Sequence, residues 1–246
     1  MKNNLRNTAS ALALCASVIG LLASAPFAHA QNTQQIKAEL QKRLGSTANI
    51  KGVSASPVPG LFEVQLNGEI FYTDTNAKYL IQGDVIELAT GQNLTEKRQA
   101  DLNRIRWSDL PLSNAIKMVR GNGSRQLAVF ADPNCGYCKR LEKTFQQLDN
   151  VTVYTFLLPI LSADSMQKSK QIWCSADATK VWTDWTINNT TPSGKGECAT
   201  PIDKNLALAK SYGITGTPTI FFTDGSRFPG AVQLSDIEKK FASLKQ

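Results

Sequence analysis

Apolar and polar positions along the first third of the chain change from a helical to a strand period. Apolar residues repeat at helical spacing over residues 33–44, and Gly45 follows where a C-terminal cap glycine belongs. Residues 50–90 have a strand-like pattern, in which apolar and polar residues alternate at 62–66 and the following Asn67-Gly68 is a strong hairpin signal. We expect strands at 62–66, 70–73, 79–81 and 85–88. The pattern predicts a small α+β unit, whose few large apolar residues favour pairing with a second copy.

A polar stretch rich in helix-forming residues follows, from Leu94 to about Trp107. Asn93 and Glu96 form a candidate capping pair at its start. A helix that is polar on most sides is typical of a connector between domains. We therefore expect a linker helix at 93–110, with the domain boundary at this point.

The middle of the chain predicts a strand, a helix and a second strand. An apolar strand at 126–131, an amphipathic helix at 135–148 and a β-branched strand at 151–158 form a βαβ unit. Residues 163–211 have a mostly helical pattern, which is interrupted at 188–196. This order of elements indicates a parallel strand pair with a right-handed crossover.

The end of the chain predicts a hairpin and a last helix. Residues 218–223 form an apolar strand, Asp224-Gly225 a turn, and Phe228 begins the partner strand. We expect a capping box at 235–238 to open the final helix.

The first thirty residues have the layout of a secretory signal peptide. Lys2 and Arg6 precede an apolar run at about 9–22, and Ala28-His29-Ala30 has the small-x-small pattern of a cleavage site. A membrane anchor fits less well, because the run falls short of the ~20 apolar residues that a span needs. We expect residues 1–30 to be removed on export.

Removing this segment changes the charge and the chemistry that is available. The chain has 27 basic and 20 acidic residues, and the loss of two basic residues leaves a net charge of +5. The basic residues are dispersed and not interleaved with aromatic ones, so nucleic-acid binding is not indicated. The only histidine, His29, leaves with the segment. This excludes histidine-dependent hydrolases and histidine-ligated metal sites.

The four remaining cysteines point to disulfide chemistry in an exported chain. Cys135 and Cys138 form a C-x-x-C motif where a predicted strand meets a predicted helix. Unpaired N–H groups and the helix dipole stabilise a thiolate there, so we expect the pKa of Cys135 to lie below the ~8.5 of a free thiol. Cys138 lies one turn further on the buried side, within reach for a disulfide. Gly136 and Tyr137 between them are expected to tune the reduction potential.

Two plainer interpretations of this motif are weaker. A zinc site would need a second close pair, but Cys174 and Cys198 stand 24 positions apart. An inert disulfide within C-x-x-C would close a very small loop and contribute little chain entropy.

A second motif, at 213–218, ends in Thr217-Pro218 and precedes an apolar strand. A proline that opens a strand after a Gly-Thr turn is a candidate for a cis peptide bond, although a trans proline at a strand start is the plainer alternative. In the cis case the backbone of Thr217 would pair with an extended substrate segment beside Cys135. Combined with a C-x-x-C motif about 80 residues upstream, the pattern is specific.

Together these residues resemble the DsbC-type thiol:disulfide isomerases of the thioredoxin superfamily. The resemblance covers nearly the whole chain after residue 30, and the residues that carry it are 135–139, 172–177 and 213–218. It implies an α+β fold in three parts. These are a cystatin-like α+β dimerisation domain at 31–92, a linker helix at 93–110 and a thioredoxin-like α/β domain with a helical insertion at 111–246.

The resemblance also implies roles for single residues. Cys135 would be the nucleophile and Cys138 its resolving partner, while Cys174 and Cys198 match the structural disulfide of the family. Substrate contacts are expected from Gly136, Tyr137, Thr217 and Pro218, where Pro218 is the cis-proline. No cofactor and no metal are implied.

The partners that the resemblance implies are misoxidised exported proteins, a second copy in a V-shaped homodimer, and a membrane reductase of the DsbD type. The implied location is the periplasm. One departure concerns thioredoxin itself, which has a buried aspartate six residues before its first cysteine, where this chain has Val129. Asp132 lies nearer in sequence, but we expect it to be a loop or cap residue.

Three related functions stay open at this point. A DsbG-type reductase of cysteine sulfenic acid is one, although that family typically has proline where this chain has Gly136. A DsbA-like oxidase is another, but such enzymes lack the extra domain and usually have valine where this chain has Thr217. A dimeric holdase chaperone, with little need of its thiols, is the third.

Overall fold

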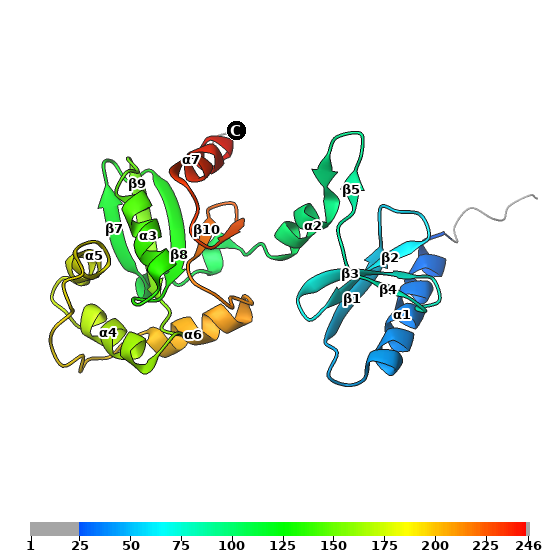
Figure 1. The fold of residues 1–246 in the computed structure, drawn as a ribbon, viewed down its shortest axis with the longest axis horizontal. Coiled ribbons are helices and arrows are strands. Elements are labelled where there is room, and N and C mark those ends of the chain that lie inside the picture. Colours follow the sequence, from blue (N-terminus) through cyan, green and yellow to red (C-terminus); the bar gives the residue numbers. More distant parts are fainter. Residues whose placement is uncertain (1–24, 245–246) are drawn as a thin grey trace, which may run out of the picture. The chain divides into compact units, whose positions relative to one another are not determined.

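The structure is a computed structural model that describes residues 25–244, with side chains from residue 32 onward (Figure 1). The chain divides into two compact units, Met1–Gly83 and Asp84–Gln246. The predicted signal peptide at 1–30 lies almost wholly outside the described residues and stays a prediction. Within the described range, no helix is long and apolar enough to cross a membrane.

The amino-terminal unit packs one helix on a four-stranded antiparallel sheet of order β1-β2-β3-β4. The elements are α1 (Ala25–Leu44), β1 (Ile50–Ala55), β2 (Leu61–Leu66), β3 (Glu69–Asp74) and β4 (Leu80–Ile81). Ile36 and Leu40 of α1 are buried against Val64 of β2, as the helical spacing predicts. The hairpin between β2 and β3 turns at Asn67 and Gly68, whose positive φ values of 54° and 90° confirm the predicted turn.

The residues between the two sheets fold differently from the prediction. The strand expected at 85–88 is β5 (Ile86–Glu87), which pairs only with β6 (Gln92–Asn93) in a separate two-stranded hairpin. The Asn93 side chain accepts the N–H of Glu96 at 2.9 Å and caps α2 (Leu94–Leu102) as expected.

The linker helix expected at 93–110 is shorter, because α2 already ends at Leu102. Ile105 donates its N–H to the carbonyl of Gly225 at 3.1 Å, so this backbone bonds to the turn between the last two strands and not to its own helix. Gly225 has a φ of +80°, and a Cβ there would collide with the carbonyl oxygen of Ile105. Only glycine allows this close approach.

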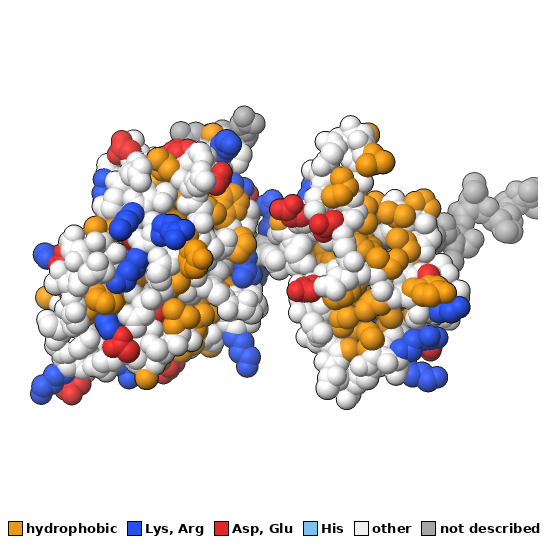
Figure 2. Space-filling model, in the orientation of Figure 1, with side chains coloured by type: hydrophobic (Ala, Val, Ile, Leu, Met, Phe, Trp, Pro, Cys, Tyr) orange, Lys and Arg blue, Asp and Glu red, His pale blue; other side chains and the backbone are white. Residues whose placement is uncertain are grey.

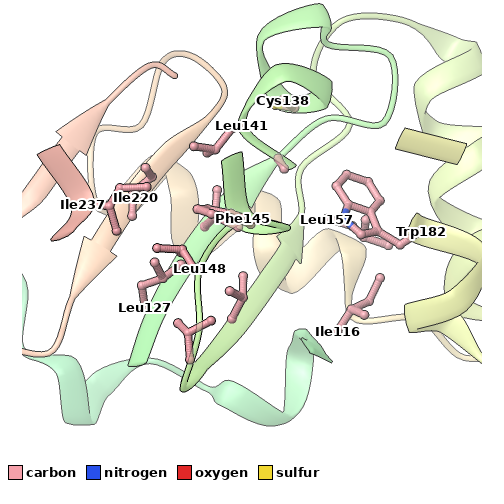
Figure 3. Packing of buried hydrophobic residues seen from close by; sticks show 14 of the residues in the cluster. Ile116, Leu127, Cys138, Leu141, Phe145, Leu148, Leu157, Trp182, Ile220 and Ile237 are labelled. Atoms are coloured by element: carbon pink, nitrogen blue, oxygen red, sulfur yellow. The ribbon is translucent and has the colours of Figure 1, made fainter. Parts of the chain in front are cut away.

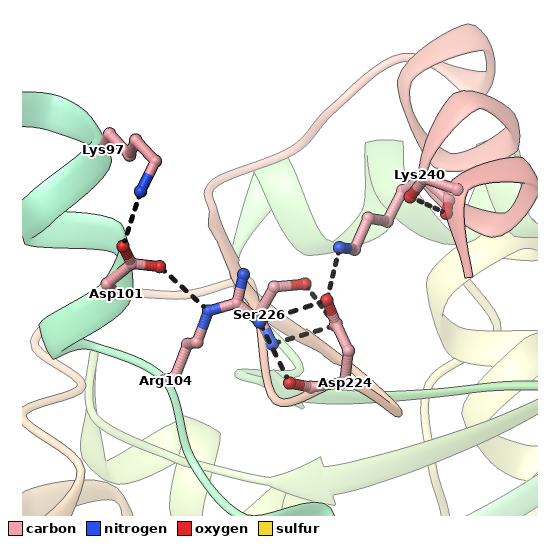
Figure 4. A network of polar contacts seen from close by, with 7 residues as sticks. Lys97, Asp101, Arg104, Asp224, Ser226 and Lys240 are labelled. Carbon is pink, nitrogen blue, oxygen red and sulfur yellow. Dashed lines mark hydrogen bonds and ion pairs between the residues drawn. The ribbon is translucent and has the colours of Figure 1, made fainter. Parts of the chain in front are cut away.

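Charged side chains reinforce the same attachment (Figure 4). Arg104 bridges Asp101 of α2 and Asp224 in the turn before Gly225, at 3.2 and 3.3 Å. Lys240 binds the same Asp224 carboxylate at 2.7 Å. Burial opposes ionisation of Asp224, but the hydrogen bonds from Lys240 and Ser226 and the charge of Lys240 together outweigh it and lower the pKa to about 2. Asp224 is therefore ionised at neutral pH and holds α2 to the last helix.

The carboxy-terminal unit is built on a five-stranded sheet of order β11-β10-β8-β9-β7. Its strands are β7 (Ile116–Arg120), β8 (Arg125–Ala131), β9 (Val151–Leu157), β10 (Thr219–Phe222) and β11 (Arg227–Pro229). Its helices are α3 (Gly136–Phe145), α4 (Ala163–Trp173), α5 (Ala178–Asn188), α6 (Ile202–Ser211) and α7 (Leu234–Ser243). Strands β8 and β9 are parallel and flank α3, which confirms the βαβ prediction. The α+β class is confirmed as well.

Strand β8 is buried on both faces and divides the core into two. Leu127 and Val129 point into a cluster with α3, α5 and α7, whereas Ala128 and Phe130 join a second cluster with α6. Figure 3 shows Phe145 of α3 in the middle of the first cluster. Because both faces are covered, the ends of β8 are fixed in place.

Two predicted helix ends need correction. The last helix starts at Leu234, and its capping box joins Gln233 and Asp236, two residues before the Ser235 box that we expected. The helix after the first cysteine begins at Gly136 and ends at Phe145, short of the predicted 135–148. Cys135 is its N-cap residue.

Candidate active site

Sheet topology brings the two sequence motifs together at one edge. Strand β8 ends at Ala131, and β10 begins beside it, with Thr219 opposite Phe130 in antiparallel register. The loop after β8 and the bend before β10 therefore meet. The peptide bond between Thr217 and Pro218 is cis, and the Cys135 Sγ lies 3.3 Å from the Thr217 carbonyl oxygen.

The two cysteines of the C-x-x-C motif are free thiols in different environments. Cys135 keeps 6% of its surface exposed, against 1% for Cys138. The hydrogen bond from the Cys138 thiol, together with the Thr217 side chain and the N–H groups of Cys138 and Tyr137, lowers the pKa of Cys135 to about 5 against the effect of burial. Burial, and then the neighbouring Cys135 sulfur, raises the pKa of Cys138.

The opposite pKa shifts give the two sulfurs different chemical roles. At neutral pH Cys135 is a thiolate, which is the form that attacks disulfides and metals. Cys138 stays protonated and donates to it. A thiol of low pKa is also a good leaving group, so a mixed disulfide at Cys135 is readily cleaved by an incoming thiol.

Helix α5 supports the reactive loop from the side, through contacts that the sequence analysis missed. The Trp185 indole N–H donates to the Pro133 carbonyl at 2.6 Å. Lys139, directly after the second cysteine, lies over the same indole ring at 3.6 Å from the centroid and donates to Asn189 at 2.9 Å. Lys168 lies 4.9 Å from that centroid. Burial, and then the charge of Lys168, lowers the pKa of Lys139.

Asp132 is a loop residue, as expected, and it is fully buried. One carboxylate oxygen accepts the Asn134 N–H and the Ser165 hydroxyl, each at 2.8 Å. The other accepts the N–H groups of Ile160 and Leu161 at 2.9 and 3.0 Å. The four acceptor positions of the carboxylate are filled, and the loops after β8 and β9 are joined through it.

The position six residues before Cys135 holds the buried apolar Val129 and supplies no carboxylate. A buried carboxyl does occur one helical turn beyond Cys138, at Glu142, where it accepts the Trp182 indole N–H at 2.9 Å. Burial raises the pKa of Glu142 to about 7. No sequence motif marks this residue, because its partner lies 40 positions away.

The second cysteine pair forms the disulfide that the resemblance implied. Cys174 and Cys198 are bonded with an S–S distance of 1.98 Å and a Cα–Cα distance of 5.7 Å. Cys174 caps the C-terminus of α4, and Cys198 lies in the segment before α6. The described residues contain no group of three histidine, cysteine, aspartate or glutamate side chains placed to hold a metal.

A free dithiol at a helix start, opposite a cis-proline on a five-stranded mixed sheet, defines a thioredoxin-like protein. The family model for the thioredoxin-like domain matches residues 112–245, more than half of the chain. The model for the N-terminal domain of disulfide bond isomerase proteins matches residues 27–96. The chain belongs to the DsbC-type thiol:disulfide interchange proteins within that fold class.

Individual relatives agree with this assignment. The chain is 45% identical over 181 residues to the probable thiol:disulfide interchange protein DsbC of Bordetella pertussis, which covers 74% of this chain and 64% of the relative. It is 25% identical over 182 residues to the Escherichia coli K12 thiol:disulfide interchange protein DsbC, which covers 72% of this chain and 75% of that one. The crystal structure of a disulfide interchange protein from Neisseria gonorrhoeae superposes with a TM-score of 0.53 at 39% identity, covering 56% of this chain and 99% of that one.

Proposed function

We propose that this protein breaks and re-forms disulfides in other exported proteins and so acts as a thiol:disulfide isomerase. The observation that carries the proposal is the asymmetric dithiol: a Cys135 thiol with a pKa of about 5, next to a Cys138 thiol with a raised pKa. The matching part of the chain spans 64% of the Bordetella relative, and the name of that relative supports disulfide interchange.

The reaction begins when the Cys135 thiolate attacks one sulfur of a wrong substrate disulfide. A mixed disulfide forms, and the other substrate sulfur leaves as a thiolate. That thiolate attacks a second disulfide of the same substrate, and a substrate thiolate finally expels Cys135 in its starting state, with no net oxidation. If the substrate stalls, Cys138 attacks Cys135, and the substrate leaves reduced while the enzyme keeps the Cys135–Cys138 disulfide.

The surroundings of the dithiol supply the substrate contacts in this proposal. The Thr217 backbone lies beside the reactive sulfur, where an extended segment can pair with it, and Pro218 fixes the bend. Gly136 leaves open space above the helix start, since nothing lies within 4 Å of the position that a Cβ would take. Tyr137 is 60% exposed, so its ring is available to a bound chain.

We infer that residues 31–92 form a dimerisation domain, that 93–110 link it to the catalytic domain at 111–246, and that the protein works as a homodimer. Support comes from the edge strand β4 and its neighbour Tyr79, where Tyr79, Leu80 and Ile81 are exposed. Figure 2 shows hydrophobic side chains gathered on the visible face of the amino-terminal unit. Exposed apolar edges of this kind are typical of interfaces.

The cellular setting belongs to the same proposal. The predicted signal peptide supports export, and the DsbC family supports the periplasm. An isomerase must be kept reduced there, which calls for a membrane reductase of the DsbD type. Sedimentation of the exported form should give twice the monomer mass, and Leu80→Lys with Ile81→Lys should shift it to the monomer.

The refolding of scrambled ribonuclease tests the activity. The reduced wild-type protein should restore ribonuclease activity, and Cys135→Ala should not. Full activity in Cys135→Ala would reject the proposal. The in vivo state of the Cys135–Cys138 couple separates the related functions, since a mainly reduced couple supports an isomerase and a mainly oxidised couple supports an oxidase.

A further inference from the structure

Large apolar side chains are exposed beside the reactive thiol. Among residues 111–244, those exposed by more than a third are Val119, Tyr137, Ile160 and Leu161. Tyr137 lies within the C-x-x-C motif, and Ile160 and Leu161, exposed by 41% and 57%, follow β9. Val119 pairs with Thr152 near the start of β9 and so lies toward the opposite end of the sheet. Three of the four therefore gather at the reactive edge.

The loop with Ile160 and Leu161 is held next to the loop that carries Cys135. Strands β8 and β9 are parallel neighbours, so their carboxyl ends share one edge, and Leu158 donates to the Ala131 carbonyl at 2.8 Å. Beyond this point the Asp132 carboxylate accepts the N–H groups of Ile160 and Leu161 on one oxygen and that of Asn134, next to Cys135, on the other.

Asp132 fixes the backbone of Ile160 and Leu161 while their side chains stay in solvent. A fully buried carboxylate with four donors holds one arrangement, because any loss of a donor leaves a desolvated charge poorly paired. The exposed side chains are thus presented in a defined position beside the thiolate. Apolar groups held in this way are typical of a binding surface.

We propose that Ile160, Leu161 and Tyr137 form an apolar lip that selects substrate disulfides with an apolar residue next to the cysteine. This inference rests on the proposed exchange function and deepens it. In a mixed disulfide the two Cα atoms lie about 4.4–6.8 Å apart, and an extended chain rises about 3.3 Å per residue. The residues adjoining the substrate cysteine must therefore pass within side-chain reach of the reactive loop and its neighbour.

The occupant is an extended chain segment in which an apolar residue adjoins the cysteine. Such a residue is buried in a correctly folded protein and exposed in a misfolded one. The lip would therefore favour misfolded chains over folded proteins whose disulfides happen to lie at the surface.

Exchange rates with two short disulfide-linked peptides test the lip. The peptides differ only beside the cysteine, where one has leucine and the other aspartate. The reduced wild-type protein should react about tenfold faster with the leucine peptide, which is the scale of discrimination that one apolar contact gives. Ile160→Ser with Leu161→Ser should remove most of this preference. Leu161→Lys should move it toward the aspartate peptide.

Val119→Ser is the matched control, because it removes an exposed apolar side chain at the other end of the sheet, and it should keep the wild-type preference. Alkylation of Cys135 by iodoacetamide should be the same in all variants, which shows that the thiolate is intact. A tenfold preference retained in the Ile160→Ser, Leu161→Ser variant would overturn the lip and leave the exchange function standing. Absence of exchange with both peptides in the wild-type protein would instead overturn the proposed function, and the lip with it.

Discussion

The two cysteine pairs after residue 30 differ in their bonding: one pair has free thiols, and the other forms a disulfide. Cys135 and Cys138 are three positions apart, free, and buried at the start of α3. Cys174 and Cys198 are 24 positions apart and joined in a disulfide. The difference shows that placement decides the role of a cysteine in this protein.

Two physical effects account for the difference. At the start of α3, N–H groups and a neighbouring thiol stabilise a thiolate, so the reduced form of the first pair is favoured. The second pair lies where a helix ends and a connecting segment passes, so a bond there restricts the unfolded chain. One pair is placed for reaction, and the other for stability.

The largest expected effect separates the two sulfurs of the reactive pair. Cys138→Ser should accumulate mixed disulfides with substrate, because attack at Cys135 proceeds and release by Cys138 is lost. Cys135→Ser should trap no substrate, since the remaining thiol is 1% exposed and has a raised pKa. Non-reducing gel electrophoresis with a misoxidised substrate measures both. Equal trapping by the two variants would contradict the assigned roles.

The second prediction concerns pH. The alkylation rate of reduced Cys135 should be constant above pH 5 and fall about tenfold per pH unit below it, because its pKa is lowered from 9.0 to about 5. Cys138→Ala should raise this midpoint, since it removes the Cys138 thiol donor that supplies the largest stabilising contact.

The same pKa shift predicts a change in folding stability. A lowered pKa in the folded state stabilises the reduced protein above the pKa of the unfolded thiol, near 9, and this stabilisation is lost as the pH falls through 5. Cys135→Ser should lack that dependence in urea unfolding. A midpoint for wild-type alkylation near 8.5 would show an ordinary thiol.

The third prediction concerns removal of the Cys174–Cys198 disulfide. Cys174→Ala with Cys198→Ala should lower the free energy of unfolding by about 3 kcal/mol, which is the chain-entropy value for a loop of roughly this length. The alkylation profile of Cys135 should not change. Urea unfolding measures the first effect, and a shifted Cys135 midpoint would show that the two pairs are coupled.

The smallest expected effect tests the support from α5. Trp185→Phe removes the N–H that binds the Pro133 carbonyl, and should slow exchange about fivefold, the equivalent of ~1 kcal/mol. Trp107→Phe is the control, because Trp107 packs on Tyr154 in the cluster on the other face of the sheet. Equal rates in both variants would show that α5 does not position the dithiol.

Local patterns made the motifs and the main elements predictable. The C-x-x-C turn, the Asn67-Gly68 hairpin and the strands on either side of α3 depend on neighbouring residues, and the structure has all of them. The spacing between the C-x-x-C motif and Thr217-Pro218 then predicted that the two motifs meet, and the structure places Cys135 beside Thr217.

Hydrogen bonds between residues far apart in the sequence could not be predicted from local patterns. Trp185 reaches Pro133 across 52 positions, and two of the N–H groups that bind Asp132, those of Ile160 and Leu161, are 28 and 29 positions away. Strand β7 was missed because it is a short edge strand whose charged residues, Lys117 and Arg120, break any alternation of apolar and polar positions. The linker helix was predicted too long because the N–H of Ile105 bonds to the Gly225 carbonyl, 120 positions away, which ends the helical pattern after α2.

The attachment at Gly225 has a mechanical consequence. Strand β10 starts after Pro218, beside the reactive sulfur. The turn that binds Ile105 through the Gly225 carbonyl follows the other end of this strand. A pull that arrives along the chain from the amino-terminal side is thus borne by the β10–β11 turn and by the charges around Asp224.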